Sequence, residues 1–253
     1  MTESSVILSC KVELLYKVMD SLRDLTSEVC FDFNKYGFHM QAIGSDHISL
    51  CVCLLPKAVF DTYEYRDDIS IGVHVHSILK IMKCSNPSDT MEMFIHDEYI
   101  HYVFTNTLND RMVEFDMKLL DLDQDRMEIP NQEYECTIDM NSATFQRVIK
   151  ELSMISDTLN IECKSNDRIV FDTDSDIGQG SVSLKSSDTL HIDCNESVRS
   201  SYSLKHLLMF TKSCNIAPNV YIRLSSSYPL MVEYLIEDDG YMRYYIAPKV
   251  MDE

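Results

Sequence analysis

The 253-residue sequence lacks most of the motifs by which enzymes and membrane proteins are recognised. It has only six glycines, and these form neither a glycine-rich phosphate loop nor a Gly-x-Ser-x-Gly nucleophile elbow. No apolar run approaches the roughly 20 residues that a transmembrane helix needs. The first five residues also lack the basic start of a secretory signal. We therefore expect an intracellular protein that is not an enzyme, does not associate with a membrane and uses no cofactor.

Patterns typical of metal sites are also scarce. Nine cysteines are present, no two of them form a Cys-x-x-Cys pair, and most lie in apolar stretches such as residues 50–55. This distribution is typical of reduced, structural cysteines in a reducing compartment. His74 and His76 are two residues apart in an expected helix, whereas helical neighbours are spaced by three or four. His191 and Cys194 form a pair without a second half, so we expect no metal site.

One acidic segment resembles the start of a calcium-binding loop. Asp121, Asp123 and Asp125 have the alternating spacing of its first ligands. The sixth position of such a loop needs glycine and the twelfth needs glutamate, but these positions are Arg126 and Gln132. We therefore exclude a calcium site here.

The sequence contains an internal repeat with a period of about 130 residues. Residues 14–22 resemble residues 144–152 at an offset of 130, and both are amphipathic at helical spacing. Residues 76–84 resemble residues 205–213 at an offset of 129. Two helix pairs with nearly the same offset indicate two copies of one domain.

Most of the remaining sequence has the character of short strands. Residues 30–42 contain a hairpin signal with Gly37 at the turn, and residues 161–171 repeat this pattern. Each half therefore has two short helices and many antiparallel strands, which indicates an α+β fold. An acidic segment with little periodicity separates the halves. We expect an N-terminal domain at 1–118, an inter-domain connector at 119–135 and a C-terminal domain at 136–253.

Positive charge is concentrated in the expected helices. The whole chain has a formal net charge of −19, which taken alone argues against nucleic-acid binding. The four expected helices, at 10–25, 74–84, 142–155 and 203–213, hold nine basic and four acidic residues and so carry a net charge of +5. The other 201 residues therefore carry −24. This pattern predicts a basic helical face that contacts phosphates without reading bases. The alternative is that these lysines and arginines are only the polar residues that any amphipathic helix carries on its exposed face.

Several stretches along the chain resemble the proliferating cell nuclear antigen family of eukaryotic-type DNA sliding clamps. The resemblance covers essentially the whole chain and depends on residues 117–123 (MKLLDLD), 129–134 (IPNQEY), 60–63 (FDTY), 78–84 (ILKIMKC), 232–234 (VEY) and 244–249 (YYIAPK). It implies an α+β DNA-clamp (processivity) fold. Two repeated domains, each with two helices packed on antiparallel sheet, would assemble as a homotrimer into a closed ring around duplex DNA.

The resemblance also implies three sets of site residues. The basic residues that face the DNA backbone would be Lys17, Arg23, Lys80, Lys83, Arg147, Lys150, Lys205 and Lys212, and one lysine of the family is replaced by Tyr16. The groove for partner proteins under the connector would be formed by Ile43, His47, Met127, Ile129, Pro229, Tyr245, Ile246, Ala247 and Pro248. Subunits would join by strand pairing of residues 110–116 with residues 177–183 of the next chain, through Phe115, Ile177, Gly178 and Val182.

We therefore expect a non-enzymatic sliding clamp that acts as a DNA polymerase processivity factor in replication and repair. Its partners would be double-stranded DNA, a DNA polymerase, other proteins that carry a PIP-box motif, and a clamp-loader ATPase. Its location would be the nucleus, or the site of viral DNA replication if a virus encodes it. Two alternatives are a subunit of a specialised heterotrimeric clamp of the damage-checkpoint type and a viral-type processivity factor that does not close into a ring.

Overall fold

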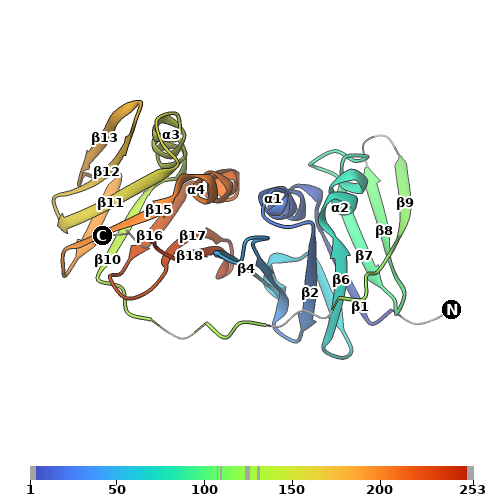
Figure 1. Ribbon diagram of the computed structural model, residues 1–253. Coiled ribbons are helices and arrows are strands. Elements are labelled where there is room, and N and C mark those ends of the chain that lie inside the picture. Colours follow the sequence, from blue (N-terminus) through green and yellow to red (C-terminus); the bar gives the residue numbers. More distant parts are fainter. Residues whose placement is uncertain (1–3, 107, 109, 123–125, 130–131, 250–253) are drawn as a thin grey trace. The chain divides into compact units, whose positions relative to one another are not determined.

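The structure is a computed structural model that describes residues 4–106, 108, 110–122, 126–129 and 132–249 (Figure 1). Its elements confirm the α+β class, with short helices and many antiparallel strands. No helix among these residues has both the length and the apolar character needed to cross a membrane. Two residues of the rejected calcium motif, Asp123 and Asp125, lie outside the described residues.

The two halves of the chain have the same order of strands and α-helices. The first half contains β1 (Val6–Lys11), α1 (Val12–Leu22), β2 (Glu28–Asn34), β3 (Gly37–Ile43), β4 (Ser49–Pro56), η1 (Lys57–Val59), β5 (Thr62–Tyr65), β6 (Ile69–His74), α2 (Val75–Met82), β7 (Thr90–Ile95), β8 (Tyr99–Asn106) and β9 (Arg111–Lys118). The second half contains β10 (Cys136–Asn141), α3 (Ser142–Leu152), β11 (Thr158–Ser165), β12 (Arg168–Ser175), β13 (Gly178–Lys185), β14 (Leu190–Cys194), β15 (Val198–Ser203), α4 (Leu204–Phe210), η2 (Thr211–Asn215), β16 (Asn219–Leu224), β17 (Leu230–Ile236) and β18 (Gly240–Ile246). Strand for strand, the predicted repeat is confirmed.

Strand pairing repeats as well. In the first half β5, β1, β7, β8 and β9 are neighbours in that order, and in the second half β14, β10, β16, β17 and β18 have the equivalent order. The strands β4, β3, β2 and β6 correspond in the same way to β13, β12, β11 and β15. All of the pairings given by register are antiparallel, as expected for strands joined by short turns.

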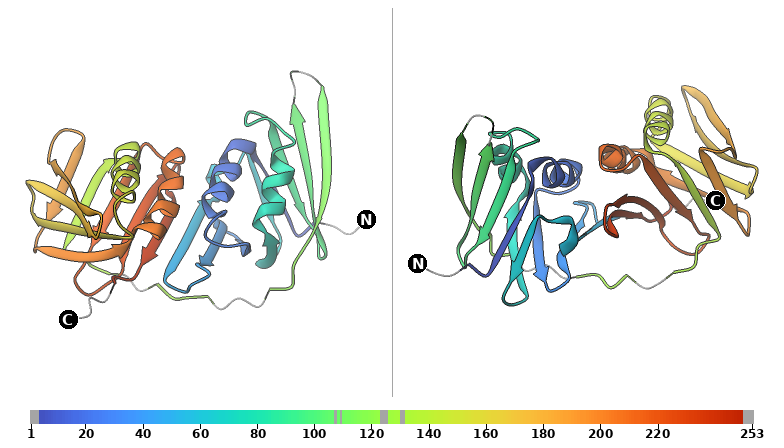
Figure 2. Two further views of the ribbon diagram at one scale, coloured as in Figure 1. Left: turned by 45° about the horizontal axis from the view of Figure 1, so that its top comes forward. Right: turned by 180° about the vertical axis from the view of Figure 1, so that it is seen from behind.

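Contacts along the chain define two compact units. The first runs as far as Ser45 and includes Val52–Met127 and Ile236–Met242. The second includes Asp46–Cys51, Glu128–Leu235 and the residues from Arg243 onward. In the first unit α1 packs beside α2, and in the second α3 packs beside α4 (Figures 1 and 2).

The apolar faces of the helices form part of each core. The four residues predicted to share one face of α1, Leu15, Val18, Met19 and Leu22, are buried. The equivalent residues of α3, Phe145, Val148, Ile149 and Leu152, are buried too. Burial of one face leaves the opposite face of each helix in solvent, and this is where the charged side chains lie.

Local interactions start each helix at a defined residue. The Asn141 side chain accepts hydrogen bonds from the backbone N–H groups of Ala143 and Thr144, at 3.0 and 3.2 Å, and so caps α3. His74 caps α2, because its Nδ1 accepts from the N–H of Ser77 at 3.3 Å. The role of His74 is therefore structural.

The observed helices are shorter than the sequence suggests. Expected segments 10–25, 74–84 and 203–213 contain helices that end at Leu22, Met82 and Phe210. In the last of these the chain continues as the 3₁₀ turn η2, which tightens the backbone at the helix end.

Candidate nucleic-acid interface

The first unit carries four of the predicted DNA-binding residues on its helix pair. Lys17 lies within α1 and Lys80 within α2. Arg23 and Lys83 lie just beyond the helices, as the C-cap residues of α1 and α2. A positive charge at a helix C-terminus is favourable because the partial charge of the backbone there is negative. All four side chains are at least partly exposed.

The second unit repeats this arrangement. Arg147 and Lys150 lie in α3, three residues apart and therefore on neighbouring positions of the helix surface. Lys205 lies in the first turn of α4, and Lys212 lies in η2 directly after that helix. Arg147, Lys150 and Lys205 are exposed, and Lys212 is half-buried. Each unit therefore presents four basic side chains from one helix pair.

Three of these eight residues are already paired with carboxylates. Lys17 contacts Glu13 at 2.7 Å and Arg147 contacts Glu151 at 2.7 Å, both across one helical turn. The Glu151 carboxylate raises the pKa of Arg147 through a hydrogen bond and through its charge. Arg23 contacts Asp20 at 2.9 Å. Such exposed pairs contribute little to stability, but they neutralise part of the charge that DNA would meet.

Four other lysines have no such carboxylate partner among the described residues. Within the part of the chain that the structure describes, Lys80, Lys83, Lys150 and Lys205 form no ion pair. An ammonium group without a carboxylate neighbour can displace condensed counterions from DNA, which is the main source of non-specific affinity. We therefore expect these four lysines to contribute more to DNA binding than the three paired basic residues.

In the first unit, the start of the expected connector lies over β6, β2 and β3. The N–H of Leu120 donates to the carbonyl of Gly72 in β6 at 2.8 Å. A Cβ atom at Gly72 would lie 2.4 Å from the Leu120 carbonyl oxygen, so only glycine lets the connector approach this closely. Farther along, Arg126 pairs with the buried Asp32 of β2.

Met127, one of the predicted groove residues, is held by β3. The Gln41 side chain donates to the Met127 carbonyl at 2.9 Å and accepts from its N–H at 3.0 Å. Gln41 and Ile43 are two residues apart on the same strand, so they share a face. Met127 is 52% exposed, which leaves an apolar side chain in solvent near this face.

The other predicted groove residues belong to the second unit. Ala247, Pro248 and His47 are exposed, whereas Ile129, Pro229 and Tyr245 are partly buried. Ile246 is only 1% exposed, so its side chain belongs to the core and cannot contact a partner. The Ala247 N–H donates to the carbonyl of Ile48 at 3.4 Å, which ties the chain after β18 to the loop before β4.

That loop, which contains His47, is anchored by a buried histidine of α4. His206 is 4% exposed, and its Nε2 lies 2.7 Å from a carboxylate oxygen of Asp46. Partial burial raises the pKa of Asp46, but hydrogen bonds from the Ile48 N–H and from His206 lower it more, so the net pKa lies below its usual value. The interaction therefore fixes the loop at the residue before His47, whose backbone has a positive φ of 59°.

The strands predicted to join subunits are sheet edges. In the described residues β9, which contains Phe115, pairs only with β8, and β13, which contains Val182, pairs only with β12. Gly178 is the first residue of β13, and Ile177 before it is 79% exposed. Edge strands with free backbone groups are templates for pairing with another chain.

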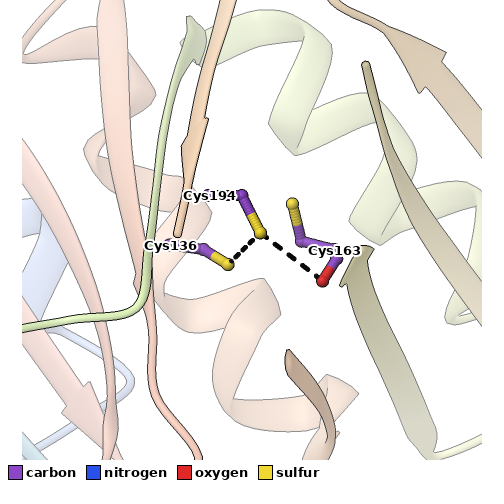
Figure 3. A group of neighbouring side chains, drawn as sticks. All are labelled: Cys136, Cys163 and Cys194. Atoms are coloured by element: carbon purple, nitrogen blue, oxygen red, sulfur yellow. Dashed lines mark hydrogen bonds between the residues drawn. The ribbon is translucent and has the colours of Figure 1, made fainter. Parts of the chain in front are cut away.

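The sequence did not reveal one further cluster of reactive side chains. Cys136, Cys163 and Cys194 lie 27 and 31 residues apart, yet strand pairing in the second unit brings their thiols together (Figure 3). A hydrogen bond from the Cys136 thiol lowers the pKa of Cys163 to about 7, in opposition to burial. The apolar surroundings of these residues in the sequence suggested only a structural role.

Two family models match this chain. The model for the N-terminal domain of proliferating cell nuclear antigen matches residues 8–128, and the model for its C-terminal domain matches residues 128–249. Two such domains, built from antiparallel sheets and few helices, define the subunit of a DNA sliding clamp. The chain belongs to the proliferating cell nuclear antigen family, as its sequence motifs predicted. Proteins of this family are non-enzymatic scaffolds that act with DNA and replication proteins.

Proposed function

We propose that three copies of this chain close into a homotrimeric ring that encircles duplex DNA and tethers a DNA polymerase to it. The observation that carries this proposal is the separation of charge: basic helices, with four lysines outside any described ion pair, on a chain of net charge −19. Contacts to phosphate carry no sequence information, so a basic lining holds DNA and still lets the ring slide. The acidic remainder keeps DNA away from other surfaces.

Ring closure gives a physical role to the two edge strands. We propose that β9 of one subunit pairs with β13 of the next, through Phe115, Ile177, Gly178 and Val182. Both strands are eight residues long, so their ladders match in length. A heterologous contact of this kind, repeated three times, leaves no open edge. No nucleotide-binding motif is present in the sequence, so opening of the ring would require a separate loader ATPase.

We further propose that replication and repair proteins dock their PIP-box segments on the predicted groove residues. Exposed Met127 near Ile43, and exposed Ala247 and Pro248, supply apolar surface of the kind that receives a short helical turn. A nuclear location follows from this role and is part of the proposal.

Molar mass in solution tests the ring directly. Three subunits of 29.3 kDa give about 88 kDa, measured by light scattering at low micromolar concentration. The ring should then stimulate a polymerase on primed circular DNA and lose this effect when the circle is cut, because a topological tether slides off an open end. A stable mass of one subunit at all concentrations would refute the homotrimer and favour a heterotrimeric or unclosed clamp.

A further inference from the structure

Three cysteines converge at one end of the second unit. Cys136 is the first residue of β10, Cys194 is the last residue of β14, and Cys163 lies in β11 (Figure 3). The three Sγ atoms all lie within 4.8 Å of one another. In the part of the chain that the structure describes, this is the one group of three or more potential metal ligands at such a spacing.

Strand register, and not chance proximity, holds two of these thiols together. Cys136 and Cys194 are directly opposite each other on antiparallel strands. The next backbone hydrogen bond runs from the Asn195 N–H to the Glu135 carbonyl, at 2.9 Å. The two cysteines therefore form a non-hydrogen-bonded pair, the type in which facing side chains come closest. Their Sγ atoms are 2.7 Å apart.

The third thiol comes from the other sheet. Cys163 is opposite Val198 of β15 and Ile169 of β12, and its Sγ completes the triangle with the first two. Cys136 and Cys163 are 0% exposed and Cys194 is half-buried, so Cys194 is the most accessible of the three thiols.

An oxygen atom is also available at the cluster. The main-chain carbonyl of Glu196 lies 3.2 Å from the Sγ atoms of both Cys136 and Cys194. The turn that carries this carbonyl is anchored, because the side-chain oxygen of Asn166 accepts a 2.6 Å hydrogen bond from the Cys194 N–H. The site thus offers three sulfur atoms and one oxygen from four fixed positions.

We propose that Cys136, Cys163 and Cys194 bind one thiophilic metal ion, Zn²⁺, as thiolates, with the Glu196 carbonyl or a water molecule in the fourth position. An ion about 2.3 Å from each of three sulfurs requires sulfur atoms about 4 Å apart. The cluster meets this geometry after side-chain shifts of about 1 Å. The Cys136 and Cys194 sulfurs move apart from 2.7 Å, and the two sulfurs that are farthest apart, within 4.8 Å, move closer.

The charges of this site favour a divalent ion. Binding converts three thiols and Zn²⁺ into a complex of three thiolates with a net charge of −1, and it releases three protons to solvent. A monovalent ion such as Cu⁺ would leave −2 in a largely buried place, where uncompensated charge is costly. The ion would join β10 and β14 of one sheet to β11 of the other, and so clip together the two sheets of the second unit.

Metal titration of the full-length chain tests this proposal. The protein is reduced with a phosphine, freed of metal with a chelator, and titrated with Zn²⁺ against a chromophoric chelator. Cd²⁺ is titrated in parallel, because thiolate-to-cadmium charge transfer gives an ultraviolet band that oxygen ligands do not. Cys194→Ser is the test variant, since Cys194 is the most exposed of the three and its replacement should leave the fold intact. Cys84→Ser, which removes an exposed cysteine outside the cluster, is the matched control.

Each outcome decides the question. One equivalent of Zn²⁺ per chain, the cadmium band and a higher melting temperature with zinc are expected for the unmodified protein and for Cys84→Ser. Cys194→Ser should lose at least tenfold in affinity and lose most of the band. Binding that survives Cys194→Ser, or no binding by folded and fully reduced protein, would overturn the proposal. A Cys136–Cys194 disulfide that re-forms in air even with excess Zn²⁺ present would also overturn it.

Discussion

The ion pair on α3 predicts that neighbouring basic residues contribute unequally to DNA binding. Lys150 forms no ion pair among the described residues, whereas Arg147 contacts Glu151 at 2.7 Å. We expect Lys150→Gln to weaken binding of duplex DNA more than Arg147→Gln does. We also expect Glu151→Gln to strengthen it, because this change frees the Arg147 guanidinium.

The size of the effect follows from counterion release. Each phosphate contact contributes about 0.9 to the slope of log affinity against log salt concentration. Between about 50 and about 200 mM salt, one such contact therefore changes the affinity by about 3.5-fold. Lys150→Gln should reduce the slope by about 0.9 for each subunit that contacts DNA. Arg147→Gln should reduce it by less, since the Glu151 carboxylate neutralises part of the Arg147 charge before DNA arrives.

Fluorescence anisotropy of a labelled duplex, measured at several salt concentrations, gives the slope for each variant. Asp188→Asn is the control for Glu151→Gln, because it changes the net charge equally but lies in the turn between β13 and β14, outside the helices. If Asp188→Asn and Glu151→Gln raise the affinity equally, the net charge of the chain governs binding and the local reasoning is wrong. If Arg147→Gln reduced the salt slope as much as Lys150→Gln or more, the argument from the ion pair would be wrong as well.

Three further predictions concern assembly, partner docking and pH. Ile177→Lys places a charge on an exposed residue at the start of the β13 edge, so we expect light scattering to show loss of the trimer. Tyr36→Lys changes another well-exposed residue, outside that edge, and should keep the trimer. Gly72→Ala creates a clash with the connector, and we expect calorimetry to show at least a tenfold loss of affinity for a PIP-box peptide. Asp46→Asn removes a carboxylate whose pKa is lowered by its hydrogen-bond partners, including His206. Because the pKa is lower in the folded state, the carboxylate stabilises that state fully above about pH 3.8. This stabilisation is lost as the pH falls through the lowered pKa. The difference in unfolding free energy between Asp46→Asn and the unmodified protein should therefore be present at pH 7 and vanish in acid.

Each of these predictions has a result that would contradict it. A trimeric Ile177→Lys variant would exclude the proposed edge pairing. Unchanged peptide affinity in Gly72→Ala would show that the position of the connector does not affect peptide binding. A stability difference for Asp46→Asn that persists at the lowest pH would show that its origin is packing, not the charge of the carboxylate.

The helices and the repeat could be predicted from the sequence because their signals are local. Leu15, Val18 and Met19 recur at helical spacing, so one face had to be buried, and the same pattern returned 130 residues later. The concentration of basic residues in these segments could be counted for the same reason. Helix ends were less predictable, because the last turn of α4 changes into η2 under tertiary contacts that periodicity does not encode.

Only the tertiary structure decided which residues far apart in the sequence meet. The contact of His206 with Asp46 joins residues 160 positions apart, and no sequence pattern indicates it. The cluster of Cys136, Cys163 and Cys194 depends on strand register, since a shift of one residue would point a side chain to the opposite face of its sheet. The sequence by itself determined the family, the repeat and the basic helices, whose information lies in short segments. The thiol cluster and the anchored loop are non-local, because they exist only where separate strands and helices pack together.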